Sequence, residues 1–146
     1  MPGKLTTTLH KIDKIENVQN RLLVKQYHNF MDSTGASERH QNNNLKVIYY
    51  YVNYLGKDIF LSSITSCDSI LLFLETKKKT KDEDPNGKWI STWNHYFHRI
   101  KHFFRWERKK NIIRIELQEN PDILFKNLLV EFIRNDNYQR LIELLV

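Results

Sequence analysis

The densest group of side chains able to contribute positive charge or hydrogen bonds lies between Lys88 and Trp106. This stretch contains all three tryptophans, three of the six histidines and several cations, and it has no acidic residue. Ammonium, guanidinium, hydroxyl and amide groups bind phosphate oxygens, and the hydroxyls and amides also bind base edges. The chemistry that these residue types favour is therefore binding of a nucleic acid, mainly through its backbone.

These groups act together only if one element presents them on one side. At about 100° per residue, the stretch predicts a helix over 89–108 with two distinct faces. The apolar face, which we expect to enter a core, comprises Trp93, Phe97, Ile100 and Phe104. The opposite, hydrogen-bonding face comprises Lys88, Thr92, His95, Arg99 and His102. On the same wheel, Trp106 falls on the polar side.

Positive charge is concentrated around this helix. The whole chain of 146 residues has a formal net charge of +6. Residues 77–110 contain eleven Lys or Arg against four Asp or Glu, whereas the segments before and after are nearly balanced or slightly acidic. A local excess of this kind suits neutralisation of phosphates better than general solubility.

A second helix with an uncommitted polar face is predicted over 38–55. Ser37 is a suitable N-cap, Glu38 in the first turn suits the helix dipole, and Gly56 is placed to end the helix. Leu45, Ile48, Val52 and Leu55 share its apolar side, and the opposite side carries Arg39, Asn43, Lys46, Tyr50 and Asn53. Of the three consecutive tyrosines, we expect Tyr50 to be exposed. The amides of the tract 41–44 would be useful against base edges or phosphates.

The rest of the chain predicts further helices and their connectors. Residues 1–11 are expected to form a flexible arm, and apolar spacing predicts a helix over 12–31. Thr65 and Asp68 resemble a capping box that opens a short helix to about Lys77, and a charged loop follows to Gly87. Alternation in 112–117 predicts a short strand or extended linker, and Asn120-Pro121 starts a helix that is followed by another over 138–146. We therefore expect an all-α domain over 12–110 and an appended segment over 111–146 that consists of a linker and short helices.

Composition excludes several classes of protein. The single cysteine, Cys67, cannot form an internal disulfide. No apolar run reaches the length that a membrane span needs, and the N-terminus lacks the apolar core of a signal peptide. We expect a cytoplasmic protein that does not insert into membranes.

Three pieces of sequence resemble the N-terminal core-binding domain of tyrosine recombinases, the phage-integrase family, in an archaeal-type version. They are Gly56-Lys57-Asp58 after the second predicted helix, Asp84-Pro-Asn-Gly-Lys-Trp-Ile-Ser-Thr-Trp-Asn94 at the start of the fourth, and Arg99-Ile-Lys-His-Phe-Phe-Arg-Trp106 at its end. The resemblance covers roughly residues 10–108. It implies a SAM-like four-helix bundle that closes over one side of DNA, with its second and fourth helices at the major groove.

In that family the chemistry belongs to a separate C-terminal domain, in which a tyrosine attacks the scissile phosphate. Residues 111–146 are too few for such a domain and contain no His-x-x-Arg motif with a downstream Tyr. We therefore expect no catalytic residues and no enzyme activity in this chain alone. The resemblance implies double-stranded DNA and other recombinase subunits as partners, in DNA integration and recombination, with no small-molecule substrate and no cofactor.

The predicted DNA-binding residues lie on the two polar faces and in the loop between them. Lys88, Arg99 and Lys101 are expected to contact phosphates, whereas Thr92, Asn94 and His95 reach phosphates or bases. The complete set is Arg39, Asn43, Lys46, Tyr50, Lys77, Lys78, Lys88, Ser91, Thr92, Asn94, His95, Arg99, Lys101 and His102.

Other interpretations of the same residues stay open at this point. The cationic face and the lysine run 77–81 also suit plain solvation. His95, His98 and His102 have spacings seen in metal sites, but a zinc site usually needs a fourth ligand, so we predict no metal. The alternative function is that of a helical protein–protein interaction module, which dimerises or docks a partner through residues 121–146. A small metal-dependent enzyme is a third option, against which the absence of an acid, base or nucleophile constellation argues.

Overall fold

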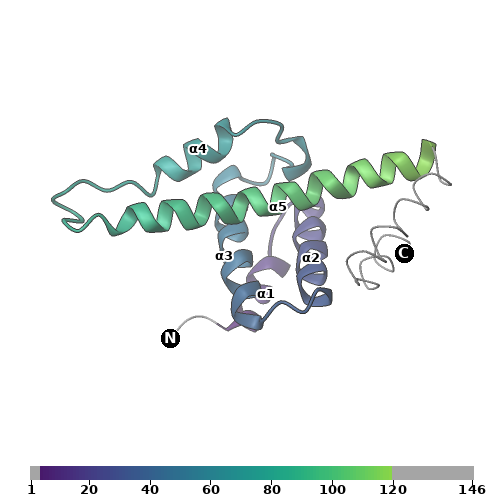
Figure 1. Cartoon of the computed structure of the whole chain (residues 1–146), viewed down its shortest axis with the longest axis horizontal. Coiled ribbons are helices and arrows are strands. Elements are labelled where there is room, and N and C mark those ends of the chain that lie inside the picture. Colours follow the sequence, from purple (N-terminus) through teal and green to yellow (C-terminus); the bar gives the residue numbers. More distant parts are fainter. Residues whose placement is uncertain (1–3, 120–146) are drawn as a thin grey trace, which may run out of the picture.

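Five α-helices pack together in residues 4–119, the part of the chain that this computed structural model describes, with side chains described for residues 4–111 (Figure 1). In chain order they are α1 (Leu5–Asp13), α2 (Val18–Ser33), α3 (Glu38–Leu55), a 3₁₀ turn (Leu61–Ser63), α4 (Asp68–Glu75) and α5 (Lys88–Glu119). The described residues contain no strand. The prediction of an all-α fold is confirmed.

Helix α3 lies at the centre of the packing, because it contacts each of the other four helices. Figure 1 shows α5 crossing the group formed by α1, α2 and α3, with α4 beside α5. One continuous core fills the space between these helices. From α3 it takes Leu45, Ile48 and Tyr51, all of them fully buried, and from α5 it takes Ile100, Phe103 and Phe104.

The ends of α3 follow from its sequence. The Ser37 side chain accepts a hydrogen bond from the main-chain N–H of His40 at 3.2 Å, and so satisfies one of the free donors of the first turn. Gly56 ends the helix with φ of 85°, a conformation that is costly for residues with a Cβ. Both predicted ends of this helix are confirmed.

Helix α1 replaces most of the predicted flexible arm over 1–11, and that prediction is wrong for the described residues. Thr8 and Ile12 are buried against α3. The Thr8 hydroxyl donates to Oδ1 of Asn42, which pairs two buried polar groups. Burial of these side chains outweighs the modest helix propensity of the threonine run 6–8.

The single helix predicted over 12–31 is interrupted between Asp13 and Val18. Asn17 causes the restart: its Oδ1 accepts from the main-chain N–H of Asn20 at 3.0 Å, and its Nδ2 donates to the Lys57 carbonyl at 2.9 Å. An asparagine that caps a helix favours extended backbone at its own position, so the first helix cannot run through it.

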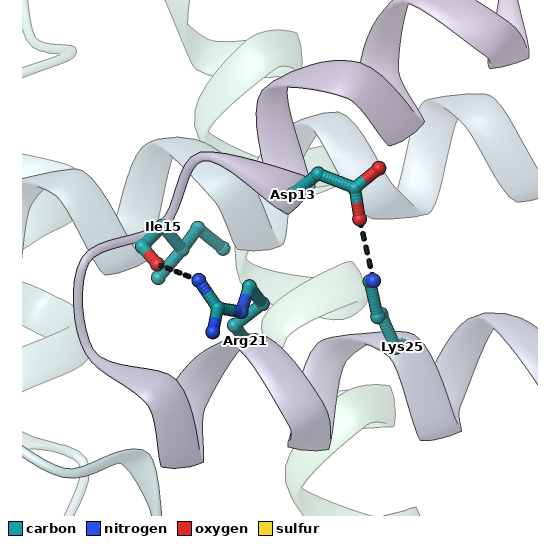
Figure 2. A network of polar contacts seen from close by, with 4 residues as sticks. All are labelled: Asp13, Ile15, Arg21 and Lys25. Carbon is teal, nitrogen blue, oxygen red and sulfur yellow. Dashed lines mark hydrogen bonds and ion pairs between the residues drawn. The ribbon is translucent and has the colours of Figure 1, made fainter.

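Polar contacts hold this corner between α1 and α2 (Figure 2). The Lys25 ammonium lies 2.6 Å from the Asp13 carboxylate and lowers the pKa of that carboxyl group. Nη1 of Arg21 donates to the Ile15 carbonyl at 3.3 Å. Because the Lys25–Asp13 pair is half exposed, its main role is to orient the two helices rather than to stabilise them strongly.

Helix α4 is short, and its start differs from the prediction. Cys67 precedes its first residue and makes no capping hydrogen bond with its side chain, so the capping box predicted from Thr65 and Asp68 does not form. Ile70, Phe73 and Leu74 anchor the helix in the core. The helix ends at Glu75, and Lys77 lies two residues beyond it, after the C-cap residue Thr76.

Helix α5 runs well past its predicted end near residue 108. It continues to Glu119, so the strand or linker predicted over 112–117 is wrong. No glycine or proline occurs between Gly87 and Pro121, and Arg, Lys, Glu and Leu are good helix formers. At its start, Oδ2 of Asp84 accepts from the main-chain N–H of Trp89 at 2.8 Å.

The helices predicted over 121–146 lie outside the described residues. Within residues 4–119, no helix is both long enough and apolar enough to cross a bilayer.

Candidate nucleic-acid interface

The two predicted faces of α5 are present, with the polar one turned outward. Lys88, Thr92, His95 and His102 are exposed and Arg99 is half-buried. Ser91, Asn94 and Lys101 are exposed beside them. On the apolar face Ile100 and Phe104 are buried, while Trp93 and Phe97 are half-buried and stack at 5.6 Å between ring centroids. One helix therefore anchors itself in the core and presents cations and hydrogen-bonding groups to solvent.

The buried side of α5 is wider than the predicted stripe. Phe103 is fully buried and was not predicted to be. Trp106 was placed on the polar side, which is wrong, because its ring packs against Tyr27 at 5.1 Å and Phe30 at 5.9 Å. Helix α2 covers this part of α5 from a second direction, so residues beyond a narrow stripe become buried.

Helix α3 contributes a narrower polar surface than its sequence predicted. Arg39 and Tyr50 are exposed, and Asn43 and Lys46 are half-buried. The three other amide residues of the tract, Gln41, Asn42 and Asn44, are buried.

Intramolecular hydrogen bonds explain that burial. Nε2 of Gln41 donates to the Ala36 carbonyl at 2.9 Å, and Nδ2 of Asn44 donates to the His40 carbonyl at 2.8 Å. The donor groups of these two buried amides thus have partners, whereas Oε1 of Gln41 is buried without one among the described residues. Within the tract, Asn43 is thus the amide that remains at the surface.

The polar surfaces of α3 and α5 meet at a pair of tyrosines. The rings of Tyr50 on α3 and Tyr96 on α5 lie 6.5 Å apart with planes 22° from parallel. Behind them the ring of Phe73 from α4 lies 6.3 Å from Tyr96. The Lys77 ammonium lies 6.0 Å from the centroid of Tyr50, 5.4 Å from Phe73 and 5.5 Å from Tyr96.

This arrangement brings together three predicted residues, Tyr50, Lys77 and Arg99. The residue that links them is Tyr96, which lies near all three. Tyr96 was not predicted, although it lies three residues before Arg99 and so on the same side of the helix. Because α3, α4 and α5 are distant in sequence, only packing of the core joins these positions.

The Tyr96 hydroxyl is a hydrogen-bond donor at neutral pH, as that of an ordinary tyrosine is. Burial raises the pKa of its hydroxyl, the nearby Tyr50 raises it further, and Arg99 acts in the opposite direction. The raised pKa makes the phenolate form rarer still, so the hydroxyl can donate to an anion and is a poor nucleophile.

Several predicted residues lie away from this meeting point. Lys78 pairs with Glu75 at 2.9 Å, and the Lys101 ammonium lies over its own neighbour Phe97 at 5.8 Å. Arg39 precedes Tyr50 by about 16 Å along α3, and Lys88 precedes Tyr96 by about 12 Å along α5. Figure 1 shows the loop before α5, with the start of that helix, projecting beyond the group of α1 to α3. The predicted residues therefore form two lines that meet at the tyrosine pair, not one compact cluster.

Within the side chains described here, no group of three His, Cys, Asp or Glu residues gathers at a distance suited to a metal ion. His95 and His102 both stay exposed on α5.

Comparison with known proteins adds no relative. No family model matches the chain, and neither a curated protein nor a solved structure matches it.

Proposed function

We propose that this protein binds duplex DNA through the surface that α3 and α5 form together, mainly by contacts to the phosphate backbone. The observation that carries the proposal is the construction of α5. Its aromatic side is fixed in the core, while Lys88, Thr92 and His95 project from the other side. A rigid helix with exposed cations and donors is a common way to place many contacts along a DNA backbone at once.

The charge distribution supports the same function. The segment with eleven cations against four carboxylates comprises the loop before α5 and most of that helix. Cations that neutralise phosphates release counterions from DNA, which gives affinity without reading the sequence. Thr92, Asn94 and His95, which are exposed on α5, are suited to base edges as well as to phosphates.

We further propose that the chain acts as the SAM-like core-binding module of a tyrosine recombinase. The support is the sequence resemblance together with the identity of the helices involved. The second and fourth helices of that module meet DNA, and they correspond here to α3 and α5, which pack against each other. In this role the protein holds DNA for integration and recombination beside other recombinase subunits, and it performs no strand cleavage itself.

The test is a mobility-shift titration on duplex DNA at two salt concentrations. We expect affinity to fall steeply as salt rises, because phosphate contacts dominate. The double variant Lys46→Ala with Arg99→Ala removes one cation from each helix and should weaken binding by roughly tenfold or more. Its circular dichroism spectrum should match that of the unchanged protein.

A matched control removes the same charge elsewhere. Lys11 is exposed in the last turn of α1, and Lys14 is exposed just after that helix. The double variant Lys11→Ala with Lys14→Ala lowers the net charge by the same amount as Lys46→Ala with Arg99→Ala. This control should bind DNA nearly as well as the unchanged protein. No binding at low salt would refute the proposed function, and equal losses in the two double variants would refute the assigned surface.

A further inference from the structure

We propose that Tyr50, Lys77, Tyr96 and Arg99 form a phosphate clamp, a preformed site for one phosphodiester group of the DNA backbone. Tyr50 belongs to α3, Lys77 lies just after the end of α4, and Tyr96 and Arg99 belong to α5. This inference rests on the proposed function, and it assigns a specific phosphate contact to one point on the surface that α3 and α5 form together.

The position of Lys77 carries the first step. Its ammonium lies within 5.4–6.0 Å of three ring centroids, and cation–π attraction fixes a lysine side chain that is otherwise flexible. Among the described residues no carboxylate pairs with Lys77, whereas the adjacent Lys78 is paired with Glu75. An aromatic ring holds a cation without neutralising it, so Lys77 keeps its full charge for an anion.

The second step concerns the donors around that charge. The half-buried Tyr96 ring lies against Tyr50, and Arg99 is on the same side of α5, three residues along. The Tyr96 hydroxyl is protonated at neutral pH like any tyrosine, and burial raises its pKa further. Two cations and two phenol hydroxyls suit the non-bridging oxygens of a phosphate, which accept several short, charge-assisted hydrogen bonds.

The third step distinguishes a phosphate from a stacked base. The planes of Phe73 and Tyr96 lie 16° from parallel, and those of Tyr96 and Tyr50 lie 22° from parallel. The three rings therefore resemble a stacking platform. These rings already have partners within the protein, however. Each ring contacts another ring, and the Lys77 ammonium lies over all three. The rings therefore position the cation, and the charge and hydroxyl groups bind the ligand.

The experiment compares Lys77→Gln with Lys78→Gln in the full chain, by fluorescence anisotropy on duplex DNA across a salt series. The two variants remove the same charge from adjacent residues. We expect Lys77→Gln to weaken binding roughly tenfold and to lower the slope of log affinity against log salt by about one. The Lys78→Gln variant should lose less than about threefold, because it removes the same net charge but no direct contact with the bound phosphate. Equal losses in the two variants, with DNA binding intact in the unchanged protein, would overturn the clamp and leave the proposed function standing.

Further measurements distinguish a phosphate of duplex DNA from inorganic phosphate, and distinguish phosphate binding from stacking of a single-stranded base. Tyr96→Phe keeps the ring and removes the hydroxyl, so it should weaken duplex binding severalfold without changing the melting temperature by more than a few degrees. An NMR titration with inorganic phosphate should shift the Tyr50 and Tyr96 ring signals only weakly. Saturation by inorganic phosphate in a protein that does not bind duplex DNA would refute both proposals. A loss confined to single-stranded DNA in Lys77→Gln would assign the rings to base stacking and overturn the clamp.

Discussion

Asn20 holds α2 to the connector before α4, and its replacement by alanine should destabilise the whole fold. The side chain is almost fully buried, at 1% exposure. Its Nδ2 donates to the Ile59 carbonyl at 2.8 Å, and its Oδ1 accepts from the main-chain N–H of Leu61, also at 2.8 Å. Leu61 is itself fully buried, so water cannot take over the bond to its N–H.

The magnitude follows from these two bonds. A buried hydrogen bond contributes about 1 kcal/mol, and a buried donor that is left without a partner costs about 1–3 kcal/mol. The bond to the Ile59 carbonyl is only partly buried, whereas the bond to the Leu61 N–H is buried, so loss of the Ile59 bond should cost less. We expect Asn20→Ala to lower the free energy of unfolding by about 3 kcal/mol and the melting temperature by roughly 10 °C.

Urea unfolding followed by circular dichroism measures this change, with Asn53→Ala as the control. Asn53 is an exposed asparagine on α3, so its replacement should alter the free energy of unfolding by no more than about 0.5 kcal/mol. A loss below about 1 kcal/mol in Asn20→Ala, with the same urea dependence as the unchanged protein, would show that the connector does not depend on this side chain.

Two other predictions concern the aromatic core. Phe103→Ala should lower the free energy of unfolding by about 3–5 kcal/mol, since the ring is fully buried and packs at 5.1 Å against Tyr27; a urea titration that finds less than about 2 kcal/mol would contradict this. Burial raises the pKa of Tyr27 to about 12, against about 10 in the unfolded chain. The contribution of this group to stability is therefore fully present below pH 10, and the free energy of unfolding should fall by about 2–3 kcal/mol as pH rises from 10 to 12. Melting temperatures recorded through that range should fall less in Tyr27→Phe, and equal decreases in the two proteins would count against the assignment.

Elements with local signals were predictable from the sequence, and α3 is the clearest example. Ser37 and Gly56 act through their own side chain or backbone, so their positions alone define both ends of the helix. The exposed side of α5 was equally visible, because periodicity places Lys88, Thr92 and His95 opposite the aromatic residues whatever the partners of the helix are.

Features that depend on distant partners were not predictable in this way. The threonine run of α1 gives a weak local signal, and the helix forms because Thr8 and Ile12 find cover on α3. Trp106 is buried because α2 reaches a second side of α5, which no single-helix projection contains. Asn17 is the exception, since an asparagine before an apolar run is a recognised helix start that the continuous apolar spacing concealed.

The meeting of Tyr50 with Tyr96 is of the same long-range kind. Each polar face was predicted separately, but the point at which they join depends on how α3 crosses α5. Lys77 was predicted as part of a charged loop, whereas its position against three rings follows from the packing of Phe73 in α4.

The place of α5 at the end of the described chain determines when the fold can form during synthesis. Ribosomes release residues in order, so α1 to α4 emerge before the helix that completes their core. Until Ile100, Phe103 and Phe104 follow, the apolar side of α3 that they cover stays open to solvent. Nascent chains that stop before α5 should thus be sensitive to proteases and bound by chaperones, and protection should appear abruptly once this helix has left the exit tunnel.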